Sequence, residues 1–407
     1  MTRRIFSLCM IGTLVVLAAV APAAAAQPAT AGGRGEVVAV NALRSLERVA
    51  DVRAELAGAG FGTDSVRFGV DTFQVVYRTV DPAGRPTVAS GLLSLPRGGG
   101  KALRAVVYTH GTEINRLDAP SMWRDGWGAG PNLTYASAGF AAIAPDYLGL
   151  GLGPGTHPFL DLPSETSASL DMLRAARRLV ADGGRTLDRG VLLTGFSQGA
   201  SAATALGRHL LAGGDPWFRL RALAPISGAY DFRRVELPAL LGGTVPRPYN
   251  VGYLSYLVVA WNRLHGLYAT PGEIFAAPYA ATVEKLFDGL HAGPDLASGL
   301  PATPPELFTP RGLALLRHPT GPFAAALAVH DASCGGFAGR VPVRLFVSRA
   351  DEQVPAASSD HCRRELAGAG IDAPIVDVPV PPDAETAHLT SNITGTAQAV
   401  AWFTGLA

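Results

Sequence analysis

Ser197 stands in the sequence context that most strongly indicates chemistry. It is the centre of the pentapeptide Gly195-Phe196-Ser197-Gln198-Gly199, which follows the apolar run 191–194 and precedes a stretch of small residues. A G-x-S-x-G motif between a strand and a helix predicts a sharp turn from which the serine hydroxyl projects as a nucleophile. Glycines fit at both ends because larger side chains would collide across the turn. The start of the helix also directs free N–H groups toward the serine.

A serine hydroxyl is a weak nucleophile unless a neighbouring base accepts its proton. Of the nine histidines, His388 is the candidate because it follows the last predicted strand and precedes the last predicted helix, in the chain order Ser…Asp…His. Asp351 directly follows the apolar run 343–347, so its carboxylate is expected to orient the imidazole and to stabilise its protonated form. Asp360 is the alternative acid. The sequence therefore predicts a catalytic triad of Ser197, Asp351 and His388.

The negative charge that develops on an attacked carbonyl oxygen requires hydrogen-bond donors. The backbone N–H of Gln198, directly after the nucleophile, is the first predicted donor. The second is expected from the loop after the apolar run 105–108, which contains His110, Gly111 and Thr112. We assign it to the backbone of Thr112, with Gly111 as the alternative. The sequence thus predicts an oxyanion hole made of two loop segments.

The elements that must position these residues alternate between strands and helices. Short apolar runs separated by helical stretches indicate a parallel sheet covered on both faces. A hairpin over 66–95 precedes them and makes the predicted sheet mixed, while residues 36–57 have helical spacing and predict an N-terminal helix. The apolar runs are 105–108, 141–144, 191–194, 220–226, 343–347 and 375–378, and the helical stretches lie near 165–182, 198–212, 356–367 and 392–404.

The alternation stops over residues 232–340, which are rich in Leu, Tyr, Pro and Gly and look mostly helical. A structureless loop of this length is improbable in a compact domain, so we expect a folded helical cap between predicted strands six and seven. Its apolar segment 249–261 either lines the substrate pocket and meets lipid or forms the core of the cap, and we favour the core. The predicted pocket residues are Gly111, Tyr147, Tyr253 and Tyr256.

The first 26 residues have the features of an export signal. Basic Arg3 and Arg4 precede a short apolar run and small residues that suit cleavage after Ala26, and the pair of arginines loosely resembles a twin-arginine signal. The mature chain then contains an N-terminal helical segment (27–64) and two core segments (65–231 and 341–407) on either side of the cap.

Two cysteines, Cys334 and Cys362, remain in the mature chain after cleavage. In an oxidising compartment two such thiols usually pair, so the sequence predicts a disulfide, with two separate buried thiols as the alternative.

Composition excludes several classes of protein. The 407 residues are 48% hydrophobic and 16% charged with a formal net charge of +1, which argues against disorder and against binding to a nucleic-acid backbone. The sequence has no cluster of Cys and His residues at metal-binding spacing, so no metal site is predicted.

Together these motifs resemble the α/β-hydrolase superfamily, and more narrowly the secretory lipases of the fungal lipase A type and their bacterial relatives. The residues that carry the resemblance are His110-Gly111, the segment 144–151, the pentapeptide 195–199, the segment 348–355 and Ala387-His388. The resemblance covers roughly 65–231 and 340–405. It implies hydrolysis of carboxylic esters through an acyl-enzyme on Ser197, without a metal or organic cofactor. A small-molecule or lipid ester substrate, transient contact of the cap with a lipid interface and a monomeric chain are expected with it.

Other functions are compatible with the same residues. The triad could serve an exopeptidase or amidase, or an acyltransferase; an exopeptidase would need acidic groups for the substrate ammonium, and those near the motifs are Glu113, Asp118 and Glu165. A different class of function is a binding module that keeps the fold without catalysis.

Overall fold

A mixed sheet of nine strands forms the centre of the computed structural model, which describes residues 33–124, 126–382 and 384–406. The strand order is β1-β2-β3-β5-β4-β6-β7-β8-β9, antiparallel from β1 to β5 and parallel from β5 onward, as the alternating sequence pattern predicts. The strands are β1 (Val37–Leu46), β2 (Val70–Val80), β3 (Pro86–Pro96), β4 (Ala102–Thr109), β5 (Ala141–Pro145), β6 (Thr186–Phe196), β7 (Arg219–Ile226), β8 (Leu345–Val347) and β9 (Ile375–Asp377).

The N-terminal segment corrects one prediction. Residues 36–57 were expected to form one helix, but they form the edge strand β1 followed by the helix α1 (Val49–Gly58). The helical spacing of its apolar residues is misleading because most of β1 is exposed, and Val38 and Val40 are 50% and 40% exposed. Pairing with the long strand β2 supplies the backbone hydrogen bonds instead, and valine suits such a strand. With β1 counted, the cap follows the seventh strand and precedes the eighth.

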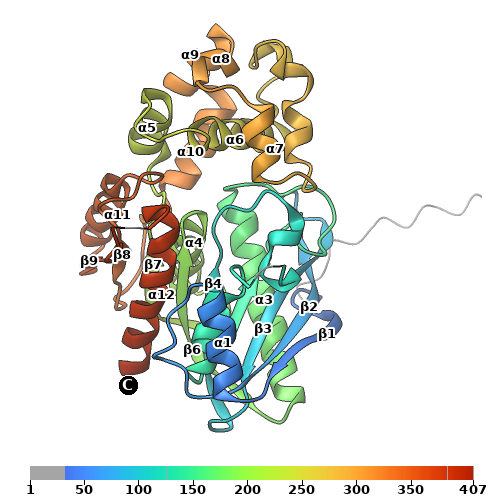
Figure 1. Cartoon of the computed structure of the whole chain (residues 1–407), viewed down its shortest axis with the longest axis vertical. Coiled ribbons are helices and arrows are strands. Elements are labelled where there is room, and N and C mark those ends of the chain that lie inside the picture. Colours follow the sequence, from blue (N-terminus) through green and yellow to red (C-terminus); the bar gives the residue numbers. More distant parts are fainter. Residues whose placement is uncertain (1–32, 125, 383, 407) are drawn as a thin grey trace, which may run out of the picture.

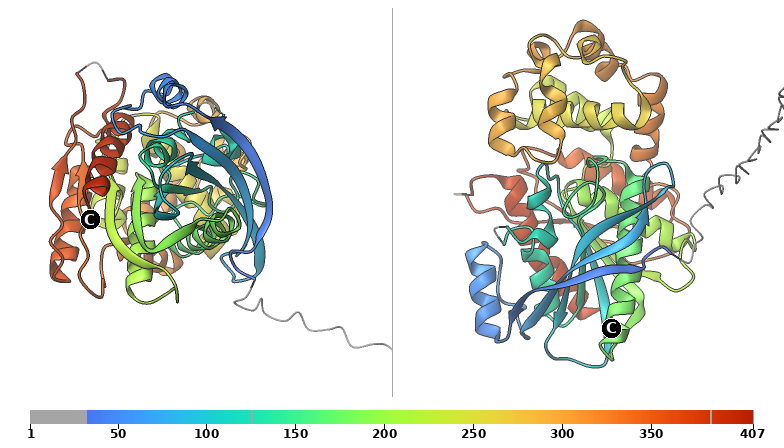
Figure 2. Two further views of the ribbon diagram at one scale, coloured as in Figure 1. Left: turned by 90° about the horizontal axis from the view of Figure 1, so that it is seen from below. Right: turned by 90° about the vertical axis from the view of Figure 1, so that its right-hand side faces the viewer.

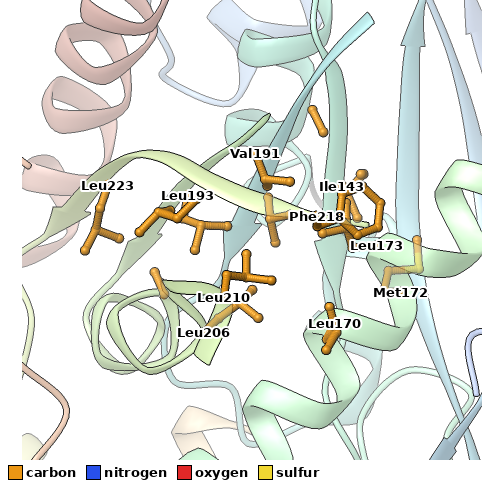
Figure 3. Close-up of a cluster of buried hydrophobic side chains, with 14 of the residues drawn as sticks. Ile143, Leu170, Met172, Leu173, Val191, Leu193, Leu206, Leu210, Phe218 and Leu223 are labelled. Atoms are coloured by element: carbon orange, nitrogen blue, oxygen red, sulfur yellow. The ribbon is translucent and has the colours of Figure 1, made fainter. Parts of the chain in front are cut away.

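Helices cover both faces of the sheet (Figure 1, Figure 2). On one face α3 (Leu162–Asp182), α4 (Gln198–Leu211) and α11 (Ala356–Gly368) share a buried cluster with the strands. On the other face α1, α2 (Gly130–Ser137) and α12 (Ala387–Gly405) share a second cluster. Figure 3 shows part of the first cluster, in which Val191 and Leu193 of β6 lie beside Leu206 and Leu210 of α4. Burial on both faces explains why the central strands are apolar throughout.

The cap lies beyond one end of the sheet (Figure 1, Figure 2) and has its own hydrophobic core. Helix α6 is buried along most of its length, so the segment 249–261 is core of the cap, the interpretation favoured from the sequence. Phe159, Leu160 and Val354, which lie outside the cap segment, belong to the same cluster and join cap to core. The cap elements are η3 (Phe232–Glu236), α5 (Leu237–Gly242), α6 (Tyr249–His265), η4 (Pro271–Glu273), η5 (Tyr279–Ala281), η6 (Val283–Phe287), α7 (Gly293–Gly299), α8 (Pro304–Leu307), α9 (Pro310–Arg317) and α10 (Gly321–Asp331).

Two further features bear on the expectations about export. Cys334 and Cys362 form a disulfide, which joins the segment after α10 to helix α11. Within residues 33–124, 126–382 and 384–406 no helix has the length and apolarity needed to cross a bilayer. The predicted signal peptide and its cleavage point lie outside the described residues.

Candidate active site

Ser197 occupies a strained turn between β6 and α4. Its φ of 56° and ψ of −120° place a non-glycine residue in a conformation that L-amino acids rarely adopt. The motif glycines are needed for space: a Cβ on Gly195 would meet the Thr109 hydroxyl and the Gly199 carbonyl, and a Cβ on Gly199 would meet the Thr109 carbonyl. The turn therefore presents the serine hydroxyl at the end of a central strand, as the motif predicts.

Three side chains from distant parts of the sequence meet at this hydroxyl. His388 Nε2 lies 2.9 Å from Ser197 Oγ, and His388 Nδ1 lies 2.7 Å from Asp351 Oδ2. Ser197 and His388 are 6% and 2% exposed, so bulk water has little access to the hydrogen bonds. The predicted residues Ser197, Asp351 and His388 are thus brought together in one hydrogen-bonded row.

The loop after β8 fixes the carboxylate of Asp351. Its Oδ1 accepts hydrogen bonds from the backbone N–H groups of Gln353 and Val354, each at 2.9 Å, and leaves Oδ2 for His388. Because the carboxylate accepts from the His388 Nδ1–H, that nitrogen carries the proton and Nε2 is left as the acceptor for the Ser197 hydroxyl. The alternative acid, Asp360, lies on α11 and is not the hydrogen-bond partner of His388.

His388 is placed differently from the sequence expectation. The sequence placed it in a loop before the final helix, but it is the second residue of α12, whose N-cap is Thr386. The Thr386 side chain accepts a hydrogen bond from the Leu389 N–H, so the helix begins earlier than its apolar pattern indicates. The imidazole is therefore carried by a regular element.

The two predicted oxyanion donors lie beside the serine. Gln198 is the first residue of α4, a position whose N–H has no acceptor within its own helix. Thr112 lines the same cavity as Ser197 and Gln198. A Cβ on Gly111 would lie 2.8 Å from the Phe196 ring, so glycine lets this loop approach the nucleophile turn.

A cavity of about 30 Å³ lies between Ser197 and the cap. This volume holds about one water molecule, whereas small-molecule sites typically measure about 300–1,000 Å³. The cavity at Ser197 is therefore smaller in this structure than an ester substrate. The cavity is lined by Thr112, Phe159, Leu160, Ser197, Gln198, Ala229, Phe232, Glu236, Leu240, Tyr253, Gln353 and Val354.

The predicted pocket residues lie at different places around this cavity. Tyr253 lines the cavity, but Gly111, Tyr147 and Tyr256 are not among its lining residues. Tyr147 is buried and donates its hydroxyl to the His110 carbonyl, and Tyr256 stacks between Phe159 and Phe287 in the cap interface. Their aromatic rings are used for packing, which the sequence alone does not distinguish from contact with a substrate.

Solved structures with a similar architecture include an esterase and a lipase. The esterase LipA from Xanthomonas oryzae, described as degrading the rice cell wall, is 29% identical over 90% of this chain and 97% of its own, with a TM-score of 0.78. Lipase A from Candida antarctica in its closed state is 17% identical over 91% of this chain and 83% of its own, with a TM-score of 0.65. This chain has the α/β-hydrolase fold. The sequence matches no protein-family profile and no curated protein at a significant level.

Within this α/β-hydrolase fold, Glu352 contacts the start of the helix that carries His388, which the sequence analysis missed. Its Oε2 accepts hydrogen bonds from the N–H groups of Ala387 and His388, at 3.0 and 3.2 Å, at the start of α12. Its Oε1 accepts from the Gln353 amide, whose own oxygen accepts from the Tyr253 hydroxyl at 2.6 Å. A carboxylate at a helix N-terminus is favourable, so Glu352 stabilises the helix that carries the imidazole. In the sequence, the feature that could have indicated this role is the position of Glu352 directly after Asp351.

A second missed feature lies behind Gln198. Its side-chain amide donates to His157 Nε2 at 2.9 Å and to Glu165 Oε1 at 2.6 Å. His157 Nδ1 donates to the Leu148 carbonyl, so Nε2 is the acceptor in the neutral ring. Burial lowers the pKa of His157 to about 3 and raises the pKa of Glu165 to about 8. His157 and Glu165 thus fix the side chain of Gln198, whose backbone N–H is predicted to donate a hydrogen bond to the oxyanion.

Burial likewise lowers the pKa of His110 to about 4, and its Nδ1 donates to the Gly111 carbonyl at 2.7 Å. His110 is therefore neutral and hydrogen-bonds the loop of the predicted oxyanion hole.

The described part of the chain holds no group of three or more Cys, His, Asp or Glu side chains placed to bind a metal ion.

Proposed function

We propose that the protein is a secreted serine hydrolase that cleaves carboxylic esters through an acyl-enzyme on Ser197. The observation that carries this proposal is the continuous hydrogen-bonded row from Ser197 Oγ through the His388 imidazole to Asp351. A buried serine, a neutral imidazole and a fixed carboxylate in this geometry are the parts required for nucleophilic acyl transfer.

The mechanism follows from the positions of these atoms. His388 Nε2 accepts the hydroxyl proton while Ser197 Oγ bonds to the ester carbonyl carbon, and Asp351 stabilises the resulting imidazolium. The backbone N–H groups of Gln198 and Thr112 would donate to the oxyanion. Collapse of the intermediate breaks the bond to the alcohol, which takes the proton from His388. Water then attacks the acyl-serine by the same route and releases the acid.

Ester hydrolysis is favoured over exopeptidase activity. The solved structures with this fold include an esterase and a lipase, and much of the cavity wall is apolar. Of the acidic residues considered for binding a substrate ammonium, Asp118 pairs with Arg124 at 2.9 Å and Glu165 accepts from Gln198. Asp118 is thus paired with a cation, and Glu165 is engaged by the protein through Oε1.

The proposed secretion rests on the N-terminal sequence and agrees with the disulfide between Cys334 and Cys362, since such bonds persist mainly in oxidising compartments. We also propose that the cap moves to admit the substrate, and that the cap of a monomeric chain contacts a lipid interface.

The test is the variant Ser197→Ala, with Ser298→Ala on the exposed surface of the cap as the matched control. We expect Ser197→Ala to lower kcat/KM for 4-nitrophenyl butanoate by on the order of 10³ or more and to abolish labelling by a fluorophosphonate. The control should keep both. Near-normal hydrolysis by Ser197→Ala would show that another residue is the nucleophile.

A further inference from the structure

Glu236 places a buried carboxyl group in the wall of the active-site cavity, and the proposed mechanism does not use it. It is the last residue of η3, at the start of the cap, and is 3% exposed. It lines the cavity together with Ser197, and its Oε1 has no hydrogen-bond partner among the described residues. A buried polar atom without a partner is costly, so such an atom in a binding cavity indicates a group that the substrate completes.

The Ser358 hydroxyl hydrogen-bonds the Glu236 carboxyl group, and Oε1 is the oxygen left without a partner. The Ser358 hydroxyl oxygen accepts from the Tyr230 N–H at 2.7 Å. Asp231 accepts from Arg234 at 2.9 Å, and Asp331 accepts from the Phe232 N–H at 2.7 Å. Of these contacts, only the one between Phe232 and Asp331 joins the start of the cap to α10, and none of them is made by Glu236 Oε1.

Glu236 is an uncharged acid near neutral pH. Burial raises its pKa to about 8, the nearby carboxylates of Asp351, Asp231 and Asp331 raise it further, and the Ser358 hydroxyl opposes the shift. The protonated carboxyl group has one O–H donor and a carbonyl acceptor. Phe232 and Leu240 are among the apolar residues that line the same cavity.

The matching substrate group is a hydroxyl, because a hydroxyl both donates and accepts and carries no charge. An ammonium group has three donors and would bring a charge into an apolar cavity, where its desolvation is expensive. Gln198 Oε1 is also unpartnered, but it belongs to the amide that His157 and Glu165 hold behind the serine.

Resting on the proposed ester hydrolysis, we infer that Glu236 is a specificity-determining residue and that the preferred esters carry a hydroxyl group on the part that enters this cavity. Loss of the hydroxyl leaves the buried acid unpaired in the complex, which selects against plain alkyl esters.

The experiment compares kcat/KM for matched esters that differ by one hydroxyl. On the acyl side the substrates are the methyl esters of hexanoic, 3-hydroxyhexanoic and 6-hydroxyhexanoic acid. On the alcohol side they are the butanoates of butan-1-ol and butane-1,4-diol. The enzymes are wild type, Glu236→Leu, Glu236→Gln and the control Glu306→Gln, an exposed glutamate on α8 of the cap.

We expect wild type to prefer the hydroxylated member of at least one pair, and Glu236→Leu to reduce that preference by about tenfold or more. Glu236→Gln should retain most of it, because an amide also donates and accepts, and Glu306→Gln should retain all of it. Fluorophosphonate labelling of Ser197 verifies that each variant is folded at the site.

An equal ratio in wild type and Glu236→Leu for every pair would overturn the inference and leave ester hydrolysis intact. A wild-type preference for methyl 6-aminohexanoate over the 6-hydroxy ester would overturn it as well. If labelled wild type hydrolysed none of these esters, the proposed function itself would fail and the inference with it.

Discussion

At the scale of single residues, hydrogen bonds fix the orientation of the side chains around Ser197. Asp351 divides its two oxygens between the backbone of its own loop and His388. Gln198 directs both amide hydrogens to buried acceptors, which leaves its backbone N–H at the start of α4 facing the serine. The neutral state of His157 is essential here because a protonated ring would have no acceptor for the amide.

The Gln198 contacts lead to a prediction for His157→Phe. The phenyl ring keeps the packing against Tyr147, Phe159 and Tyr256, but one buried amide donor loses its partner. We expect kcat for 4-nitrophenyl butanoate to fall about tenfold, because the oxyanion donor is less well fixed in the transition state, while KM changes little. His318→Phe, on an exposed histidine, is the control. An unchanged kcat in His157→Phe would show that the hydrogen bond between His157 and Gln198 does not contribute to catalysis.

At the scale of elements, the ends of strands and helices bring the reacting groups together. Parallel strands β6 and β8 deliver Ser197 and Asp351 at the same edge of the sheet, and the first turn of α12 delivers His388. Glu352 connects these elements, since it accepts from the start of α12 and, through Gln353, contacts Tyr253 of α6 in the cap.

This connection predicts the behaviour of Glu352→Ala. Two N–H groups at the start of α12 lose their acceptor, so the free energy of unfolding should fall by about 1 kcal/mol. We also expect kcat/KM to fall severalfold because His388 is held less firmly. Denaturant unfolding and ester kinetics measure the two effects, and Glu352→Gln should show a smaller loss of stability because it keeps one acceptor. Glu385→Ala, in the exposed loop before α12, is the control; equal losses in both variants would contradict the role of Glu352.

At the scale of the whole molecule, the cap lies beyond one end of the sheet (Figure 1), and the cap and the core have separate hydrophobic clusters. The disulfide lies where the chain leaves the cap, and its loop contains β8 and the segment of Asp351. The disulfide therefore links the segment in which the chain leaves the cap, after α10, to the core helix α11, which follows Asp351.

The disulfide yields a prediction for the double variant Cys334→Ala/Cys362→Ala. Opening a loop with a sequence separation of 28 residues increases the conformational freedom of the unfolded chain. The free energy of unfolding should then fall by about 3–4 kcal/mol in the chain-entropy model. Guanidinium unfolding of the oxidised wild type and the double variant measures the difference, and adding reductant should lower only the wild-type value. Coincident unfolding curves for the two proteins would contradict a stabilising bridge.

The sequence by itself determined the features that depend on neighbours in the chain. The turn at Ser197 is encoded by its two glycines, and the helical cap by the interruption of the strand pattern. The positions of Asp351 and His388 could be predicted because parallel strands end at one edge of a sheet, a rule that needs no coordinates.

The tertiary structure alone decided features that depend on partners far away in the chain. Residues 37–46 form a strand because β2 lies beside them, although their spacing suits a helix. Glu236 reaches the cavity, and Glu352 caps α12, because the fold closes around them, and no local pattern marks either glutamate. Short sequence motifs determine local backbone geometry, whereas the packing of the whole chain determines which group lies next to a buried polar atom.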